Sequence, residues 1–259
     1  MNIWHAEPVS IRNCLVTGAS RGIGSVIAAR LSAAGHRVAL TARSADQLTE
    51  VAGKLSGPSL SLPADVTDPD ATNSVFDKIE EAWGPVEVLV LNAGAAVAKP
   101  LTKVTDEEWQ SQLELNLTAP FRAMRRAIPA MVERGWGRIV VIASTAGKIG
   151  EPNVGAYTAS KHGAIGLVRT ASAELARTGV TVNAVCPGYV DTPMTDGWVT
   201  RIAARTGKPE ADIRQSLADK QPIRRLIAPD EVADAVELCV LSAAITGQAI
   251  NVDGGTVQS

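Results

Sequence analysis

Short apolar runs rich in β-branched residues alternate with helix-length segments along almost the whole chain. Strands are predicted from the apolar runs at 13–18, 36–42, 59–64, 86–94, 137–144, 180–188 and 249–255. Helices are predicted between them at 22–34, 44–55, 68–83, 105–133, 155–178 and 229–242. Strands separated by helices of this length need crossover connections, and these build a parallel sheet with helices on both faces. No repeat or Pro/Gly/Ser-rich linker divides the chain, so we predict an α/β fold in a single domain over 1–259.

The composition argues against several classes of function. The formal net charge is -2, which offers no basic surface to nucleic acid or membrane lipids. No apolar run reaches the ~20 residues that a membrane span requires, and residues 1–13 lack a signal-peptide pattern. We expect a reducing, cytoplasmic location and no metal site, because the cysteines and histidines are scattered without metal-ligand spacing. These residues are Cys14, Cys186, Cys239, His5, His36 and His162.

The segment TGASRGIG (17–24) follows the first predicted strand and opens the first predicted helix. Its glycines, Gly18, Gly22 and Gly24, permit a tight turn, close approach of the backbone to a pyrophosphate, and close packing of helix on strand. The helix N-terminus presents free N–H groups and the positive end of its dipole to phosphates. The spacing is GxxxGxG rather than the common GxGxxG, so this motif alone leaves open both a structural turn and a dinucleotide site.

The end of the second predicted strand bears on the choice of nucleotide. NAD-binding proteins usually place Asp or Glu about 20 residues after the glycines, where the carboxylate holds the ribose hydroxyls. Ala42 stands at that place here, Arg43 follows it, and Arg21 lies within the glycine turn. A guanidinium can bind a 2′-phosphate through two parallel hydrogen bonds. Either arginine alone would fit a solvated surface charge, but together they favour NADP(H), with NAD(H) still possible.

Tyr157 and Lys161 lie four residues apart in GAYTASKHG (155–163), within a predicted helix. Side chains at i and i+4 meet on one helix face. A neighbouring ammonium favours the phenolate and lowers the pKa of a tyrosine from its ordinary value of about 10. The pair is therefore a candidate acid–base device, and a surface pair is the alternative. His162 points about 100° away from Lys161 around the helix, so we predict a structural or exposed side chain there.

Six motifs follow one another over nearly the whole chain. They are TGASRGIG (17–24), NAGA (92–95), LELNLTAP (113–120), VVIASTAG (140–147), YTASK (157–161) and PGYVDTPM (187–194). In this order and at these separations they resemble the motif set of the short-chain dehydrogenase/reductase family. The chain looks closest to the bacterial 3-oxoacyl-thioester and polyketide ketoreductases. The resemblance implies a Rossmann-type, doubly wound parallel sheet of about seven strands.

The resemblance also implies four catalytic positions. Tyr157 would be the general acid/base that protonates a ketone or deprotonates an alcohol, and Lys161 would lower its pKa and bind the nicotinamide ribose. Ser144 would donate a hydrogen bond to the substrate oxygen, as an oxyanion donor does. Asn116 would hold a water that links Lys161 to solvent. An intact set of four favours an enzyme over the other hypothesis, a non-catalytic nucleotide-sensing protein on the same fold.

The remaining implied positions contact the cofactor. They comprise the phosphate turn, the 2′-phosphate partner, an adenine-contacting stretch, the NAG segment and the segment beside the nicotinamide. Tyr157 and Lys161 contact the cofactor as well. The phosphate turn supplies Gly18, Ser20, Arg21 and Ile23, and the 2′-phosphate partner is Arg43. The adenine-contacting stretch supplies Asp65 and Val66, and the NAG segment supplies Asn92 and Gly94. The segment beside the nicotinamide supplies Pro187, Gly188, Val190 and Thr192.

The stretch 195–221 falls where relatives place a variable substrate lid, and KPEADIRQSLADK (208–220) has helical character, with Pro209 suited to a first turn. The resemblance to ketoreductases implies an NADPH-dependent reductase of a small-molecule ketone, here a 3-oxoacyl thioester carried on acyl carrier protein or coenzyme A. A degradative dehydrogenase of a small or cyclic secondary alcohol is the alternative. In such relatives basic residues by the cleft meet the carrier, and the candidates are Arg125, Arg126, Arg134 and Arg177.

The helices predicted at 105–133 and 155–178 carry small and apolar residues around much of their circumference. A helix that is apolar on more than one face is usually buried on more than one face. The resemblance implies that these helices pair across two-fold axes into a homotetramer, or less often a dimer.

Overall fold

The structure is a computed structural model in which residues 10–258 are described. The prediction about a signal peptide rests mainly on residues 1–9, which lie outside the described residues. The prediction about His5 falls on the same segment. Within the described part of the chain, no helix combines the length and apolarity needed to cross a bilayer.

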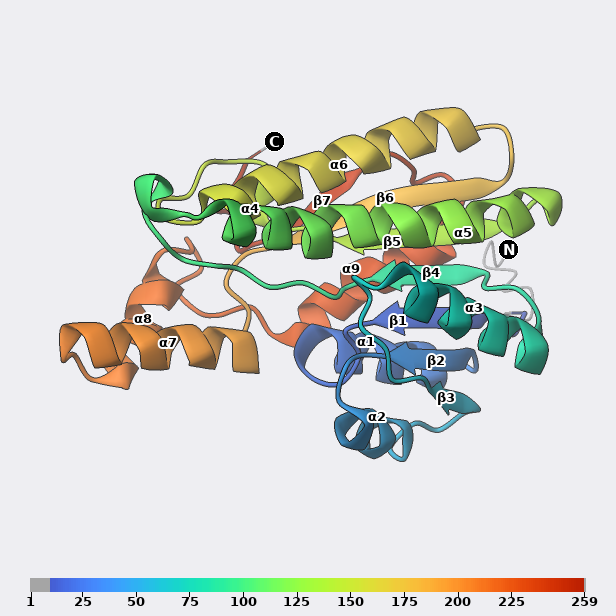
Figure 1. Ribbon diagram of the computed structural model, residues 1–259, viewed down its shortest axis with the longest axis horizontal. Helices are drawn as coiled ribbons and strands as arrows, with labels where there is room; N and C mark the ends of the chain where they lie inside the picture. The colour runs from blue at the N-terminus through green and yellow to red at the C-terminus, as the bar shows by residue number, and fades with distance from the viewer. Residues whose placement is uncertain (1–9, 259) are drawn as a thin grey trace, which may run out of the picture.

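Seven parallel strands form one sheet in the order β3-β2-β1-β4-β5-β6-β7 (Figure 1). The chain starts near the middle, builds outwards to β3, returns to the centre, and builds outwards again to β7, which is the doubly wound arrangement predicted from the sequence. The strands are β1 (Asn13–Thr17), β2 (Arg37–Thr41), β3 (Ser59–Ser61), β4 (Val88–Leu91), β5 (Gly137–Ile142), β6 (Val180–Pro187) and β7 (Ala249–Val252).

Helices cover both faces of the sheet (Figure 1). One face carries α3 (Pro69–Trp83), α5 (Ala119–Glu133) and α6 (Gly155–Leu175), and the other carries α1 (Gly22–Ala33), α2 (Ala45–Ala52) and α9 (Pro229–Leu241). Successive residues of β4 pack into the two cores alternately, because neighbouring side chains of a strand point to opposite faces. Both faces are covered, so the central strands read as continuous apolar runs in the sequence.

Strand ends and one long helix differ from the prediction. The strands predicted at 59–64 and 86–94 are shorter, at Ser59–Ser61 and Val88–Leu91, although Leu62 still donates a backbone hydrogen bond to Leu40 of β2. The helix predicted at 105–133 consists of α4 (Asp106–Leu113), a π-helical turn at Glu114–Thr118, and α5. Such turns occur frequently at functional sites.

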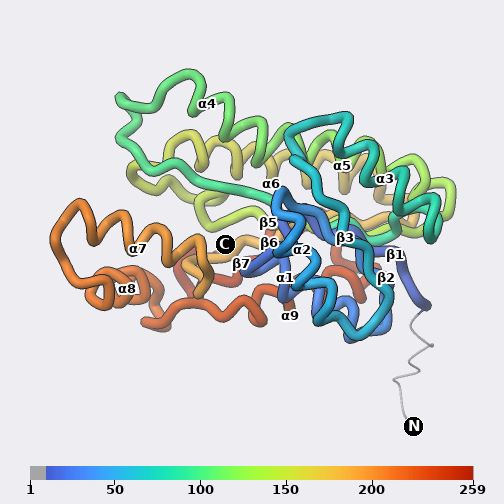
Figure 2. The backbone as a smooth tube through the Cα atoms, turned by 60° about the horizontal axis from the view of Figure 1, so that its bottom comes forward, coloured from blue at the N-terminus to red at the C-terminus, as the bar shows by residue number. Residues whose placement is uncertain are grey.

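The segment after β6 forms two helices, α7 (Pro193–Thr206) and α8 (Glu210–Asp219), which stand apart from the sheet (Figure 2). They enclose a small core of their own around Val199, Ile213 and Leu217. The carboxyl ends of the strands point towards the side of the molecule on which these helices lie (Figure 1). The prediction of helical character at 208–220 agrees with α8, whereas α7 was not predicted.

Candidate active site

A cleft opens at the carboxyl ends of the strands, between the sheet and the start of α7. It holds about 800 Å³ of empty space, its open mouth included. Crevices at this place in doubly wound sheets are the usual ligand sites. The lining residues are Ile23, Asn92, Gly94, Ile142, Ala143, Ser144, Thr145, Glu151, Tyr157, Lys161, Pro187, Gly188, Tyr189, Val190, Thr192, Met194, Thr195 and Trp198.

Tyr157 and Ser144 meet in this cleft from different elements. Tyr157 stands in the first turn of α6, and Ser144 follows β5, where its Oγ accepts a hydrogen bond from the Ala146 N–H at 3.1 Å. Burial raises the pKa of Tyr157 to about 12, and the negative charge of Glu151 adds to the rise. A hydrogen bond between the Tyr157 and Ser144 side chains acts in the opposite direction on this pKa. The phenol is therefore protonated at neutral pH.

Lys161 lies one turn further along α6, as predicted, and its side chain is buried. Its Nζ donates a 2.7 Å hydrogen bond to the Ile142 carbonyl and lies 5.6 Å from the centroid of the Tyr157 ring. Burial lowers the pKa of Lys161 to about 8. Lys161 is not among the groups that shift the pKa of Tyr157, and its ammonium is turned towards the Ile142 carbonyl, so the lowering of that pKa by Lys161 stays a prediction.

Asn116 is buried in the π-helical turn between α4 and α5. Its amide makes a closed pair with the backbone of Ala95: Nδ2 donates to the carbonyl at 3.0 Å, and Oδ1 accepts from the N–H at 3.2 Å. Gly94 lies beside it, and a Cβ at that position would sit 2.9 Å from Asn116 Oδ1 and 3.6 Å from Lys161 Nζ. Asn116 thus stands next to Lys161, and its role in holding a water stays a prediction.

The glycine turn leads into α1 without a side-chain cap. Arg21 is the N-cap residue in extended conformation, it makes no side-chain capping bond, and the first turn contains no acidic residue. The N–H groups and the positive end of the helix dipole are thus left for an anion. Asn92 ties this turn to β4, because its Nδ2 donates to the carbonyls of Thr17 at 3.0 Å and Gly18 at 3.1 Å. The structural role predicted for the NAG segment agrees with these bonds.

Arg43 follows β2 with an exposed side chain, and its positive charge contributes to lowering the pKa of Asp65, after the hydrogen bonds from Thr67. Val66 lines a mostly apolar cavity together with Thr41, Ala93 and Leu115. Arg43 thus lies close enough to Asp65 to act on it electrostatically, and the contacts of Arg43, Asp65 and Val66 with a cofactor stay a prediction. The residues present fit a phosphorylated dinucleotide: an uncapped helix N-terminus, an exposed arginine after β2, and a glycine-lined cleft beside Tyr157.

The end of β6 supplies the opposite wall of the cleft. Pro187, Gly188, Val190 and Thr192 all line it, as predicted for residues beside a nicotinamide. Thr192 is buried at the N-terminus of α7. His162 is exposed, and its Nδ1 lies 2.9 Å from the Thr158 carbonyl, so the prediction of a side chain outside the site is confirmed.

Eight lining residues were not predicted as site residues: Ile142, Ala143, Thr145, Glu151, Tyr189, Met194, Thr195 and Trp198. The Tyr189 and Trp198 rings meet edge to face, with centroids 6.3 Å apart. Tyr189 stands inside the PGYVDTPM motif, shortly after β6. Its place in this motif could have identified it as a lining residue of the cleft. The start of α7 was also signalled, by Thr192 followed by Pro193, an N-cap type residue before a proline in the first turn.

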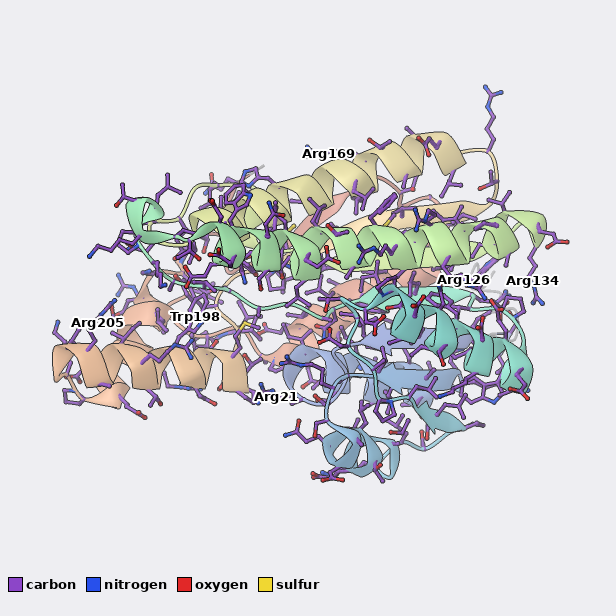
Figure 3. All side chains as sticks on the ribbon, in the orientation of Figure 1. Arg21, Arg126, Arg134, Arg169, Trp198 and Arg205 are labelled. Atoms are coloured by element: carbon purple, nitrogen blue, oxygen red, sulfur yellow. The ribbon has the colours of Figure 1, made fainter. Side chains whose placement is uncertain are left out.

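The basic residues suggested for contact with a carrier do not lie by the cleft, which is a correction. Arg126 and Arg134 lie at the end of the molecule opposite α7 and Trp198 (Figure 3). Arg126 pairs there with Glu80 at 2.7 Å and Asp77 at 3.0 Å, and Arg125 on the same helix covers the Phe121 ring. Arg177 lies two residues beyond the end of α6, whose stretch from Tyr157 to Leu175 spans about 27 Å at the rise of an α-helix.

The cleft brings the phenol of Tyr157, the hydroxyl of Ser144 and the buried Lys161 close to the start of α1, an arrangement that suits proton transfer beside a bound nucleotide on a doubly wound sheet. The family model described as short chain dehydrogenase matches residues 12–202. The chain belongs to the short-chain dehydrogenase family, and it is an oxidoreductase of that family.

Named relatives match the chain over nearly its full length. It is 39% identical to the 3-oxoacyl-[acyl-carrier-protein] reductase MabA of Mycobacterium tuberculosis, covering 96% of this chain and 94% of that protein. It is 37% identical to the D-beta-hydroxybutyrate dehydrogenase of Rhizobium meliloti, covering 94% and 98%. Among solved structures, a variant of actinorhodin polyketide ketoreductase with NADPH superposes with a TM-score of 0.90 at 38% identity, covering 95% and 97%.

Proposed function

We propose that this protein is an NADPH-dependent reductase of 3-oxoacyl thioesters, with a polyketide ketone as the related possibility. The observation that carries the proposal is the pairing of Tyr157 and Ser144 in a cleft whose other end is an uncapped helix N-terminus. Relatives named as ketoreductases, one of them crystallised with NADPH, support this assignment.

The bound nicotinamide would supply a hydride to the ketone carbon. Tyr157 gives its phenolic proton to the ketone oxygen, and its raised pKa keeps that proton in place at neutral pH. Ser144 Oγ–H donates to the same oxygen as negative charge develops. Lys161 would hold the ribose hydroxyls with its ammonium, and Asn116 would hold the water that returns a proton from solvent. The lid at 195–221 closes over the substrate and excludes water.

The cofactor is NADPH in this proposal because Arg21 stands at the N-terminus of α1 and Arg43 follows β2 with an exposed side chain, where an NAD-binding protein would carry a carboxylate. We predict that Arg43→Asp shifts preference towards NADH, since the change removes the phosphate partner and adds an acceptor for the ribose hydroxyls. The measurement is kcat/KM for NADPH and NADH with one ketone. A wild-type enzyme that already prefers NADH would contradict the assignment of both arginines.

A substrate panel tests the proposal as a whole. NADPH oxidation is followed with acetoacetyl-CoA, a cyclic ketone and a bicyclic decalone, each with the purified full chain. We expect turnover with acetoacetyl-CoA. If acetoacetyl-CoA gives no signal while the cyclic ketone reacts well, the thioester assignment is wrong and the degradative dehydrogenase stands. Inertness towards all three ketones, with NADPH bound, would favour a nucleotide sensor.

The proposal extends to assembly and location. We propose a single domain that assembles into a homotetramer through α4, α5 and α6, supported by the partly exposed Phe121 and Val132 on α5. The three cysteines are free and buried, which supports a reducing, cytoplasmic location.

A further inference from the structure

Three segments that are far apart in the sequence meet at the wall of the cleft. Tyr189, after β6, donates its phenolic hydrogen to Glu151 Oε1, which belongs to the loop between β5 and α6. Lys220, just after α8, places its Nζ 3.0 Å from Tyr189 Oη and 3.4 Å from Glu151 Oε1. The mechanism proposed above uses none of these side chains.

Tyr189 is held firmly in this arrangement. The buried Gln221 side chain accepts the Tyr189 N–H at 2.9 Å and donates to the Tyr189 carbonyl at 3.2 Å. The Trp198 ring packs against the phenol edge to face. Because the phenol is fixed, the carboxylate that accepts its hydrogen bond is fixed as well, in the wall of the cleft.

The two charges of the cluster face different surroundings. Glu151 lines the cleft together with Tyr157, and its side chain is 29% exposed. The Lys220 side chain is 54% exposed, so water screens the cation more than it screens the carboxylate. The charge of Glu151 reaches the catalytic phenol, because it contributes to raising the pKa of Tyr157. The Glu151 carboxylate is therefore a negative charge in the wall of the cleft, close enough to act on Tyr157.

We propose that Glu151 is a specificity-determining residue that excludes ketones with a free carboxylate and so selects neutral 3-oxo esters and thioesters. This inference rests on the proposed function and names the charge state of its substrate. An acetoacetate anion bound with its ketone at Tyr157 would bring a second carboxylate close to Glu151. Repulsion between like charges in a partly buried site reduces binding by about tenfold or more.

The first test compares kcat/KM for ethyl acetoacetate with kcat/KM for acetoacetate, in the full chain with saturating NADPH. Wild type should favour the neutral ester. Glu151→Gln should reduce this preference by about tenfold, because the carboxylate is neutralised while its shape remains. Lys220→Met should increase the preference, because it removes the cation that partly offsets Glu151. The control is Glu50→Gln, an exposed carboxylate on α2 paired with Lys54, and it should change nothing.

The opposite results would overturn the inference. If Glu151→Gln leaves the preference unchanged, the carboxylate does not set specificity. If Lys220→Met leaves the preference for the ester unchanged or reduces it, the cation does not offset Glu151, and the account of specificity by charge is wrong.

A second test does not depend on turnover. The chain has only two tyrosines, so 13Cζ-tyrosine labelling gives two resonances, which Tyr189→Phe assigns. The groups facing Tyr157 are Ser144, Glu151, Cys186 and Lys161. Glu151→Gln should shift the onset of Tyr157 ionisation to lower pH, followed up to the pH at which circular dichroism reports unfolding. Identical curves would overturn the role of Glu151. If neither keto substrate reacts, the proposed function fails, and this titration still decides whether Glu151 sets the potential of the cleft.

Discussion

Lys161 is an ammonium buried to 4% exposure, and its side chain has one hydrogen bond, to the Ile142 carbonyl, among the described residues. Its pKa falls from 10.5 to about 8, a difference that corresponds to about 3 kcal/mol of destabilisation at neutral pH. We predict that Lys161→Met is inactive yet more stable than wild type at pH 7. The expected gain in unfolding free energy is about 2 kcal/mol, since losing the hydrogen bond costs about 1 kcal/mol.

The pH dependence provides the control for this prediction. A buried amine whose pKa is lowered by folding opposes folding fully below about pH 8, and the penalty is lost as the pH rises towards 10.5, its value in the unfolded chain. The advantage of Lys161→Met in urea unfolding should therefore be large at pH 7 and nearly absent at pH 10. A variant less stable than wild type at pH 7 would show that the ammonium is not penalised by burial.

The residues that sequence reasoning could find are those carried by short, ordered motifs. Ser144, Tyr157 and Lys161 were predicted from spacing and resemblance, and the structure brings them into one cleft. The direction of the Tyr157 pKa was not predictable, because it depends on burial and on where the Lys161 ammonium turns. The Glu151, Tyr189 and Lys220 cluster was missed for a related reason, since three separate segments meet only in the folded chain.

Elements with strong periodicity were predicted well, and their ends and the lid less well. Strand β6 and helix α1 match the predictions to within one residue at each end. Helix α7 was missed, because it packs mainly on α8 rather than on the sheet and its apolar residues form only a small core.

The turn between α7 and α8 allows a specific prediction. Gly207 ends α7 in the left-handed conformation at φ 70°, and a Cβ there would meet nothing within 4 Å. A substitution at Gly207 therefore creates no steric clash, and its effect reports only the cost of the left-handed backbone conformation. We predict that Gly207→Val speeds amide hydrogen exchange in α7 and α8 by about fivefold, equivalent to about 1 kcal/mol. Gly207→Asn should exchange more like wild type, since Asn tolerates this conformation. Equal exchange in the Val variant and wild type would contradict this account of the lid.

At the scale of the whole molecule, apolar side chains remain exposed on two helices at opposite faces of the sheet. Phe121 on α5 is 41% exposed, and Leu238 and Leu241 on α9 are 48% and 63% exposed. We predict a tetramer of the chain by light scattering at micromolar concentration, because apolar faces of this kind are commonly covered by another copy. A mass equal to one chain would refute the proposed assembly.

The central claim is that Tyr157 transfers the proton in an NADPH-dependent ketone reduction. The most direct measurement compares Tyr157→Phe with wild type in two assays, NADPH oxidation with the ketone that reacts best and NADPH binding by fluorescence titration. The phenylalanine keeps the ring and removes only the hydroxyl, so we predict a loss in kcat of about 10³-fold or more, with NADPH affinity nearly unchanged. Turnover at the wild-type rate in Tyr157→Phe would contradict the claim.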